Sequence, residues 1–245
     1  MSSRIEGRNA VAEALRSGQA VTRLLVAKGM RTDPLVDEIL MLASGVGASV
    51  TYVDRVELDR ESERGRHQGI VAYAGEFKYA TLSALMAKVA DKDRSLVVVL
   101  DHVTDPGNFG AAIRSAEVAG ADGIIVADRR SAPVTAVVHK AAAGATSHLP
   151  VVQVTNIVQT LGLLKDAGYW IAGATERGRD SLWTAPLDGR LVIVLGSEGS
   201  GLSRLVAENC DFLVRIPVAG QVESLNVAQA ATLLAFEWMR RGADL

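Results

Sequence analysis

The sequence has a single cysteine, no long apolar run and no surplus of positive charge, and each absence narrows the class of protein. Because Cys210 is alone among 245 residues, no internal disulfide can form, which suits a reducing compartment. Apolar residues make up 49% of the chain, yet no run approaches the roughly 20 apolar residues of a membrane-spanning helix. The segment Met1–Gly7 also lacks the apolar stretch of a secretory signal. We therefore expect a cytoplasmic protein that does not enter a membrane.

The charge balance gives no general sign of a nucleic-acid partner. The chain has 26 Lys and Arg against 28 Asp and Glu, a formal net charge of −2, whereas nucleic-acid-binding domains are often basic. Any RNA contact must therefore come from a local cluster of basic side chains. The candidate cluster consists of Arg60, Arg64, Arg66 and His67. Glu61 and Glu63 lie among these residues, so a solvated mixture of loop charges is the alternative interpretation.

Residues 1–75 are predicted to form a small α/β domain. Its expected helices are Arg8–Arg16 and Pro34–Gly45, and its expected strands are Leu24–Ala27, Val50–Val53 and Gly69–Ala74. A domain boundary is expected near Gly75–Tyr79. Residues 76–94 then form a linker that is partly helical, because Thr81–Val89 is amphipathic.

Residues 95–245 are predicted to form a second α/β domain with a mostly parallel sheet. Continuous apolar runs without polar alternation are typical of strands that are covered on both faces. These runs are Val97–Leu100, Gly123–Ala127, Val151–Val154, Trp170–Ala174, Leu191–Leu195 and Phe212–Ile216. The helical patterns between and after them are Gly110–Ala119, Val134–Ala143, Ile157–Ala167, Leu202–Glu208 and Leu225–Arg241. Such alternation favours helices packed against a parallel sheet.

Three of these strands lead into polar loops that have no obvious structural use. The strands and loops together span Leu96–Arg114, Leu191–Leu202 and Val214–Ala228. In open parallel sheets, ligands bind beyond the carboxyl ends of the strands. We therefore expect one cleft to collect the polar side chains of these loops. The expected set is Asn108, Arg114, Glu198, Ser224 and Asn226.

Each of these residues also has a purely structural interpretation. Asn108 and Ser224 are both suited to cap the N-terminus of a helix. Arg114 can pair with Glu117, three residues further along the same helix. Asn226, predicted just inside the last helix, is a poor helix former and gains little from that position unless its amide is used.

The glycine-rich segment Gly196–Gly201 is not a dinucleotide-binding fingerprint. Its spacing is G-x-x-G-x-G rather than G-x-G-x-x-G, and it follows a late strand instead of the first strand of a βαβ unit. A tight turn before a helix is the alternative interpretation. His102, His139 and His148 are scattered without the spacing of metal ligands, so no metal is expected.

Taken together, the three polar segments resemble the motifs of the SpoU/TrmH family of the SPOUT superfamily. They occur in the family's order as DHVTDPGNFGAAIRSAEVAGA, LVIVLGSEGSGLS and RIPVAGQVESLNVAQAA. The resemblance extends into the N-terminal part through Gly7–Val11 and His67–Ile70, so it covers nearly the whole chain. Within the family, the chain is most similar to bacterial enzymes that methylate a guanosine 2'-hydroxyl in the peptidyl transferase region of 23S rRNA.

The resemblance implies an RNA ribose 2'-O-methyltransferase that uses S-adenosylmethionine and no metal. It implies an N-terminal RNA-binding domain similar to ribosomal protein L30e, a catalytic domain with a deep trefoil knot, and a homodimer formed through the catalytic domain. General topology rules make a knot very rare, so only the resemblance predicts it. The alternatives are the same reaction on tRNA, a non-catalytic RNA-binding assembly factor and, least favoured, a nucleotide-dependent oxidoreductase.

The resemblance also assigns roles to individual residues. The expected active-site residues are Asn108, Arg114, Glu198, Ser224 and Asn226. The expected cofactor-binding residues, which hold adenine and ribose through their backbone, are Ala174, Thr175, Gly196, Ile216 and Leu225. The expected RNA-binding residues are Arg8, Arg64, Arg66, His67 and Gln68. Arg114 is the family's proposed activator of the hydroxyl, although a guanidinium normally keeps its proton, so stabilisation of the developing alkoxide is the preferred role.

Overall fold

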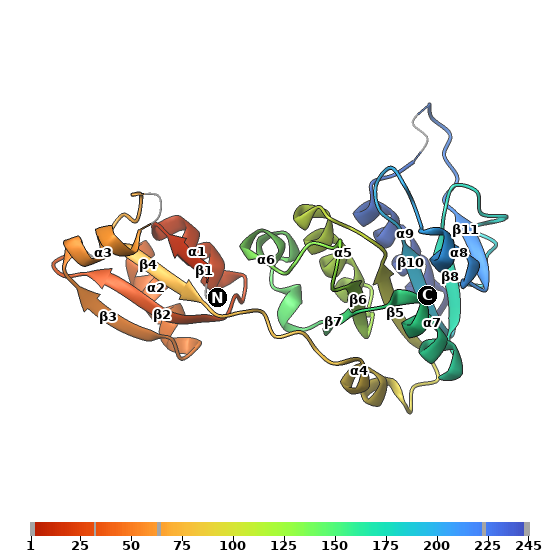
Figure 1. Cartoon of the computed structure of the whole chain (residues 1–245), viewed down its shortest axis with the longest axis horizontal. Coiled ribbons are helices and arrows are strands. Elements are labelled where there is room, and N and C mark those ends of the chain that lie inside the picture. The colour runs from red at the N-terminus through yellow and green to blue at the C-terminus, as the bar shows by residue number, and fades with distance from the viewer. Residues whose placement is uncertain (1–2, 32, 63–64, 222–223, 243–245) are drawn as a thin grey trace. The chain divides into compact units, whose positions relative to one another are not determined.

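The chain divides into two compact units, residues 1–78 and residues 79–245. The structure is a computed structural model, and it describes residues 3–31, 33–62, 65–221 and 224–242. The division falls three residues beyond the expected end of the first domain, at Lys78 instead of Gly75. Figure 1 draws the first unit in red to orange and the second in yellow to blue. Among the described residues, no helix is both long enough and apolar enough to cross a membrane.

The first unit has a mixed sheet with the strand order β1-β4-β2-β3. Its elements are β1 (Ser3–Glu6), α1 (Arg8–Arg16), β2 (Val21–Ala27), α2 (Pro34–Gly45), β3 (Ser49–Val53), α3 (Arg55–Glu61) and β4 (Ile70–Ala74). β4 runs antiparallel to β1 and β2, while β2 and β3 are parallel. α1 and α2 bury their apolar faces in one core with the sheet, and Leu58 of α3 packs in a smaller core with Leu25 and Val71. β1 and α3 were not predicted from the sequence.

The second unit has a seven-stranded parallel sheet with the order β7-β6-β5-β10-β8-β11-β9. The strands are β5 (Ser95–Leu100), β6 (Gly123–Ala127), β7 (Val151–Val154), β8 (Trp170–Ala174), β9 (Asp180–Ser181), β10 (Arg190–Leu195) and β11 (Phe212–Arg215). The helices are α4 (Leu82–Val89), α5 (Pro106–Val118), α6 (Ala136–Ala142), α7 (Ile157–Asp166), α8 (Arg204–Glu208) and α9 (Val227–Gly242), with a short 3-10 helix at Ala145–Ser147. The expected mostly parallel α/β architecture is therefore confirmed.

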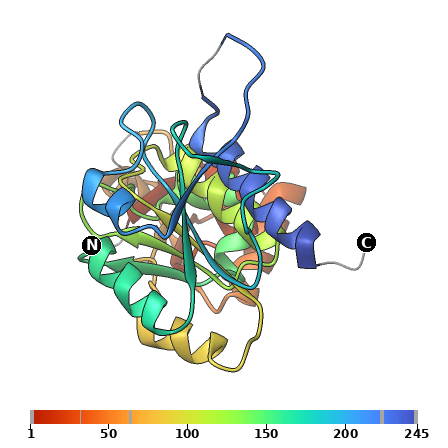
Figure 2. The same ribbon diagram turned by 90° about the vertical axis from the view of Figure 1, so that its right-hand side faces the viewer.

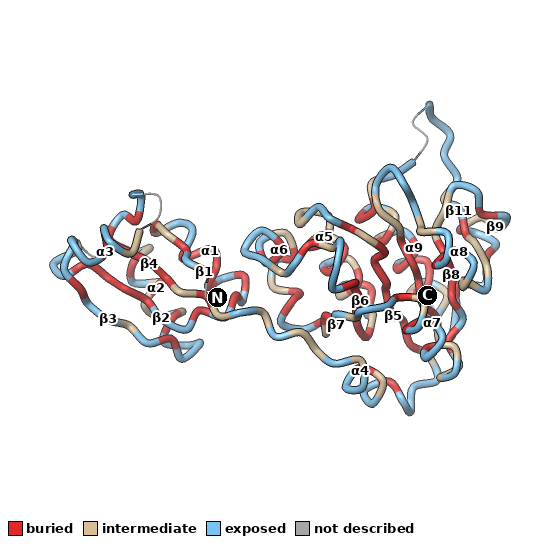
Figure 3. Tube along the Cα trace, in the orientation of Figure 1, coloured by how far each residue is buried: buried red, intermediate tan, exposed pale blue. Residues whose placement is uncertain are grey.

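Helices cover both faces of this sheet, which explains the continuous apolar runs in the sequence. α4, α7 and α8 share one buried core with β5, β6, β8 and β10. α5 packs between α6 and α9 on the other face (Figure 2). Every residue of β5 is buried, as Figure 3 shows by the red trace through the centre of the unit.

The strand register brings the carboxyl ends of the central strands to one edge of the sheet. Leu195 at the end of β10 pairs with Leu100 of β5 and with Ala174 of β8. Ala174 in turn pairs with Val214 of β11. The loops that follow these strands therefore start side by side, although they lie up to about a hundred residues apart in the sequence.

Candidate active site

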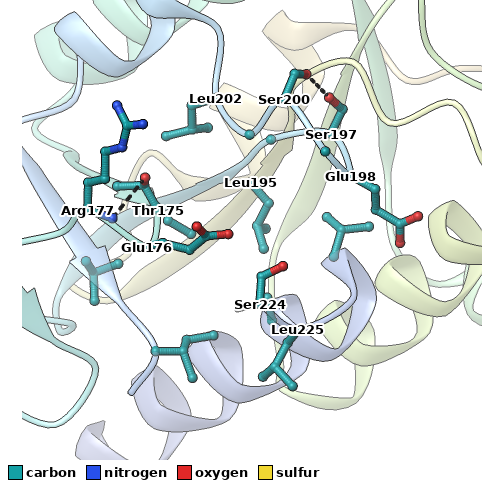
Figure 4. A pocket seen from close by; sticks show the side chains of 18 of the residues that line it. Thr175, Glu176, Arg177, Leu195, Ser197, Glu198, Ser200, Leu202, Ser224 and Leu225 are labelled. Atoms are coloured by element: carbon teal, nitrogen blue, oxygen red, sulfur yellow. Dashed lines mark hydrogen bonds between the residues drawn. The ribbon is translucent and has the colours of Figure 1, made fainter. Parts of the chain in front are cut away.

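A cavity of about 780 Å³ lies at this edge of the sheet, beyond β8, β10 and β11 and beside the start of α9 (Figure 4). Its wall includes each of the residues expected to hold the cofactor, which are Ala174, Thr175, Gly196, Ile216 and Leu225. Glu198, Ser224 and Asn226 also line it. In Figure 4 the side chains of Glu176 and Ser224 point toward the middle of the cavity.

The loop after β10 is shaped by its glycines, of which Gly196 leaves no space for a side chain. A Cβ at Gly196 would lie 2.0 Å from the carbonyl carbon of Gly201. Ser197 and Gly201 exchange two backbone hydrogen bonds, at 3.1 and 2.9 Å, and Gly199 and Gly201 have positive φ angles of 90° and 65°. The segment therefore forms a narrow hairpin in which glycine is needed for close backbone approach. Its main chain forms one wall of the cavity.

Three of the expected active-site residues form one hydrogen-bonded cluster. The Asn108 amide donates to Glu198 Oε1 at 2.7 Å. The Asn226 amide donates to Asn108 Oδ1 at 2.8 Å and to Glu198 Oε1 at 2.7 Å. The cluster joins α5, the loop after β10 and the start of α9, and its members are up to 118 residues apart in sequence. Glu198 thus fixes both amides; Glu198 and Asn226 line the cavity, whereas Asn108 lies outside its wall.

Both asparagines lie at the start of a helix, but their positions relative to the first helical residue differ from those predicted from the sequence. α5 starts at Pro106, and Asp105 caps it by accepting the Asn108 N–H at 2.7 Å, so Asn108 lies in the first turn with its amide free for Glu198. α9 starts at Val227, and Asn226 accepts the Ala228 N–H at 2.8 Å. The interpretations of Asn108 and Ser224 as caps are therefore wrong, and Asn226 lies before its helix.

Arg114 is exposed on α5 and is not part of this cluster. It lies six residues beyond Asn108, which places it about 9 Å further along the helix and roughly 120° around its axis. Among the described residues its guanidinium makes no ion pair, so the pairing with Glu117 is absent. Its positive charge is therefore available to a ligand rather than used by the fold.

Asp101 is a positioning residue that was not predicted from the sequence. Its carboxylate is fully buried at the end of β5. One oxygen accepts the Ser203 N–H at 2.7 Å, and the other contacts His102 Nδ1. This buried carboxylate ties the end of β5 to the end of the glycine-rich hairpin. The sequence pattern that could have indicated Asp101 was an acidic residue directly after an apolar strand.

Glu176 and Arg177 also line the cavity and were not predicted. Both are exposed and follow β8, and the Arg177 N–H donates to Thr175 Oγ1 at 3.4 Å. Their position just beyond the carboxyl end of a parallel strand could have indicated that they line a ligand site.

Some of the expected RNA-binding residues of the first unit are bonded to other parts of the fold, and others are exposed. Arg8 binds the Gln68 carbonyl through Nε at 3.1 Å and Asp33 through a second guanidinium nitrogen at 2.6 Å. His67 is buried, with Nε2 2.9 Å from Asp59 and Nδ1 accepting the Gly69 N–H at 3.0 Å. His67 therefore shapes the loop instead of facing solvent. Arg66 is exposed. Arg64 lies outside the described residues.

Two titratable side chains of the second unit have pKa values shifted by burial, and neither lines the cavity. Burial raises the pKa of the Cys210 thiol to about 12, so the thiol stays protonated and a poor nucleophile at neutral pH. Burial also lowers the pKa of His139. Within the ranges that the structure describes, no group of three or more His, Cys, Asp and Glu side chains is arranged to hold a metal ion.

Comparisons with known proteins match both units of the chain. The model of the SpoU rRNA Methylase family matches residues 95–236. A second model, described as RNA 2'-O ribose methyltransferase substrate binding, matches residues 4–80. A putative TrmH family tRNA/rRNA methyltransferase from Staphylococcus saprophyticus is 40% identical over 238 residues, covering 97% of this chain and 95% of the relative.

Solved structures show the same similarity. The SpoU methyltransferase AviRb from Streptomyces viridochromogenes, in complex with AdoMet, matches with a TM-score of 0.74 and 26% identity, over 98% of this chain and 90% of that one. An AdoMet-bound rRNA methyltransferase from Sinorhizobium meliloti matches with a TM-score of 0.73 and 27% identity, over 99% and 88%. With a family model that covers more than half of its length and relatives along nearly all of it, this chain belongs to the SpoU rRNA methylase family.

Proposed function

We propose that this protein transfers the methyl group of S-adenosylmethionine to the 2'-hydroxyl of a guanosine in the peptidyl transferase region of 23S rRNA. Membership of the family supports the general reaction, RNA 2'-O-methylation with this cofactor. The observation that carries the proposal is the Asn108–Glu198–Asn226 cluster, two of whose members line the same cavity as Gly196 and Leu225.

The cavity fits an adenosine-containing cofactor. Its volume of about 780 Å³ is within the usual range for small-molecule sites. Backbone from the loops after β8, β10 and β11 lines it, and amide N–H and carbonyl groups suit the edges of an adenine. When bound, S-adenosylmethionine supplies an electrophilic methyl group on a sulfonium. Ala174, Thr175, Gly196, Ile216 and Leu225 are proposed to hold it.

The remaining residues are proposed to prepare the hydroxyl. Arg114, which makes no ion pair among the described residues, stabilises the developing alkoxide and contacts the neighbouring phosphate. The hydroxyl proton leaves to phosphate or water. Asn108 orients the ribose, Glu198 holds both amides in place, and Ser224 and Asn226 shape the loop around the target nucleotide. Positioning of this kind can lower a barrier by several kcal/mol.

The first unit is proposed to select the RNA. Its match to the substrate-binding model and the exposure of Arg66 support this role. Arg8 and Gln68 contribute to the same surface. The buried His67 holds the loop of Gln68 by accepting the Gly69 N–H. A substrate-binding unit of this kind favours rRNA over tRNA, because the simplest tRNA-modifying members of the family lack it. We also propose that the unit resembles ribosomal protein L30e and that the second unit contains the trefoil knot.

We also propose that the protein forms a homodimer through its second unit. α5 and α9 expose large apolar side chains, with Val118 58% and Phe236 36% accessible. The two helices touch where Ser115 and Thr232 hydrogen-bond at 2.7 Å. Exposed apolar side chains on neighbouring helices are typical of an interaction surface.

The decisive experiment is ribose-methyl mapping of all RNA with and without the gene. We expect one guanosine of 23S rRNA to lose its 2'-O-methyl group in the deletion strain, and the purified protein to restore it with S-adenosylmethionine. Loss of a methyl group from tRNA instead would contradict the proposed substrate. No loss at all, together with no heat of S-adenosylmethionine binding in calorimetry, would favour the assembly-factor alternative.

A further inference from the structure

A second cavity, of about 270 Å³, lies at the same edge of the sheet and is not used by the proposed reaction. It is formed by the loops after β5, β6 and β7 and by the starts of α7 and α8. Its wall includes Asp101, His102, Asp128, Arg129, Arg130, Thr155, Asn156 and Ser203. Apolar side chains such as Ile157 and Leu205 form the rest of the wall, and the two arginines come from one loop.

Arg129 and Arg130 are the cationic side chains of Arg and Lys type in the wall of this cavity. Both are exposed, and neither guanidinium takes part in an ion pair among the described residues. Of the carboxylates in the wall, Asp101 is fully buried, and its oxygens bond to His102 and to the Ser203 N–H. Asp128 remains as a single opposing carboxylate. The two exposed guanidiniums thus outnumber the one exposed carboxylate of the wall, and their planar donors match phosphate oxygens.

The backbone of two wall loops is held in an unusual conformation. His102 has φ 60° and Arg130 has φ 59°, and residues other than glycine seldom adopt such left-handed angles. Strain of this kind persists only where the surrounding structure fixes it, and it is concentrated at functional sites. At Arg130 this conformation helps to set the direction in which the guanidinium leaves the loop.

The second cavity adjoins the proposed active site along the segment 202–207. Leu202 lines the larger cavity and Ser203 the smaller one, while Val206 lines the smaller cavity and Ala207 the larger. Consecutive Cα atoms are about 3.8 Å apart, so the same short segment forms a wall of both. A strand of RNA with its target ribose at the Asn108–Glu198–Asn226 cluster carries phosphates on both sides of that ribose.

We infer that the smaller cavity binds backbone phosphate of the RNA strand next to the target nucleotide, through Arg129 and Arg130. This inference rests on the proposed function and adds to it a phosphate site in the catalytic unit, separate from the substrate-binding unit. Phosphate contacts fix the register of a nucleic acid without reading its sequence. The site thus holds the strand while the first unit selects the RNA.

The test replaces Arg129→Gln and Arg130→Gln, singly and together, in the full chain. Lys88→Gln is the matched control, because it also removes one positive charge but lies on α4, near Asp122 at the opposite edge of the sheet. Binding of a transcript of the 23S rRNA region is measured by fluorescence anisotropy at several KCl concentrations. S-adenosylmethionine binding is measured by calorimetry, and methyl transfer with labelled cofactor.

Each arginine variant is expected to weaken RNA binding about fivefold and to lower the slope of log affinity against log salt by about one. Affinity for S-adenosylmethionine and the rate at saturating RNA should stay within about twofold of the wild type, because neither arginine lines the larger cavity. Wild-type RNA affinity and salt slope in the double variant would overturn the inference, as would an equal change in Lys88→Gln. A wild-type chain that binds but does not methylate the transcript would contradict the proposed function instead.

Discussion

Arg114 is the residue whose removal tests the proposed chemistry most directly. Because its guanidinium is exposed and makes no ion pair within the described part of the chain, Arg114→Ala should leave the fold intact. We expect methyl transfer to fall by at least about 100-fold, as for loss of a group that stabilises developing charge. S-adenosylmethionine affinity, measured by calorimetry, should change by no more than a few-fold, because Arg114 does not line the larger cavity.

Arg114→Lys separates charge from geometry in the same assay. A lysine keeps the positive charge but loses the planar donor pair of arginine, so partial activity is expected. If Arg114→Ala lost cofactor binding and methyl transfer to the same extent, the residue would have a structural role and the proposed chemistry would be wrong.

At the scale of single residues, the sequence predicted which side chains gather better than how they are held. Asn108, Glu198 and Asn226 meet as expected. Their helix ends were misread because Asp, Asn and Ser are similarly good caps. Pro106 was the missed signal, since proline favours the first position of a helix and places the cap at Asp105.

The packing of α5 against α6 offers a test at the scale of elements. A Cβ on Gly110 would lie 2.5 Å from the Val138 carbonyl oxygen and 2.6 Å from Ala141 Cβ. Because backbone cannot move as easily as a side chain, Gly110→Ala should destabilise the protein by roughly 1–3 kcal/mol, measured by urea unfolding. Displacement of α5 should also weaken the Asn108–Glu198 contact.

Gly162→Ala is the matched control for this prediction. Gly162 lies inside α7 and is exposed, and a Cβ added there would have no neighbouring atom within 4 Å. The same substitution there should stabilise the protein by about 0.5–1 kcal/mol, because alanine is the better helix former. Equal effects at the two positions would mean that the contact with α6 is not close.

α9 carries a buried carboxylate that links stability to pH. Glu237 is 4% exposed, and its hydrogen bonds with Arg240, followed by those with Arg241, lower its pKa to about 2. Because the folded-state pKa lies below the unfolded value of about 4.3, this stabilisation is present above a pH of about 4.3 and is lost as the pH falls through the folded-state pKa.

Glu237→Gln should therefore lose on the order of 2 kcal/mol at neutral pH and much less in strong acid. Urea unfolding at a pH of about 7, about 4 and about 2.5 spans this range and measures the difference. Glu208→Gln is the control, because Glu208 is half exposed and pairs with Arg204 on the surface, where such pairs contribute little. A pH-independent loss in Glu237→Gln would show that its ion pairs do not set the pKa.

The elements of the second unit were predictable because apolar runs and helical periodicity are local signals. The missed elements are those with weak local signals. β1 is a short edge strand with alternating charged residues, and β9 has only two residues. The strand order, in which β10 lies between β5 and β8, depends on pairings between segments distant in sequence. It therefore cannot be predicted from a local sequence pattern.

At the scale of the whole molecule, we propose a division of labour between two units of a nearly neutral chain. Each unit has its own buried apolar core, and the comparisons match each to a separate family model. The proposed RNA contacts rest on a few exposed arginines, such as Arg66 and Arg129, rather than on a basic domain.

Removal of residues 1–78 tests this division. A chain of residues 79–245 retains its own core, the larger cavity and the Asn108–Glu198–Asn226 cluster. It should bind S-adenosylmethionine within a few-fold of the full chain in calorimetry, because every proposed cofactor residue lies in the second unit. Methyl transfer to the rRNA transcript should fall below detection, since the unit proposed to select the RNA is gone.

Arg66→Gln in the full chain controls for damage caused by the truncation. It removes one exposed charge from the first unit and should weaken RNA binding several-fold while leaving S-adenosylmethionine binding unchanged. Full rRNA methylation by residues 79–245 would refute the division of labour, because the phosphate site of the catalytic unit would then suffice. Loss of cofactor binding on truncation, with wild-type binding in Arg66→Gln, would instead place part of the cofactor's support in the first unit.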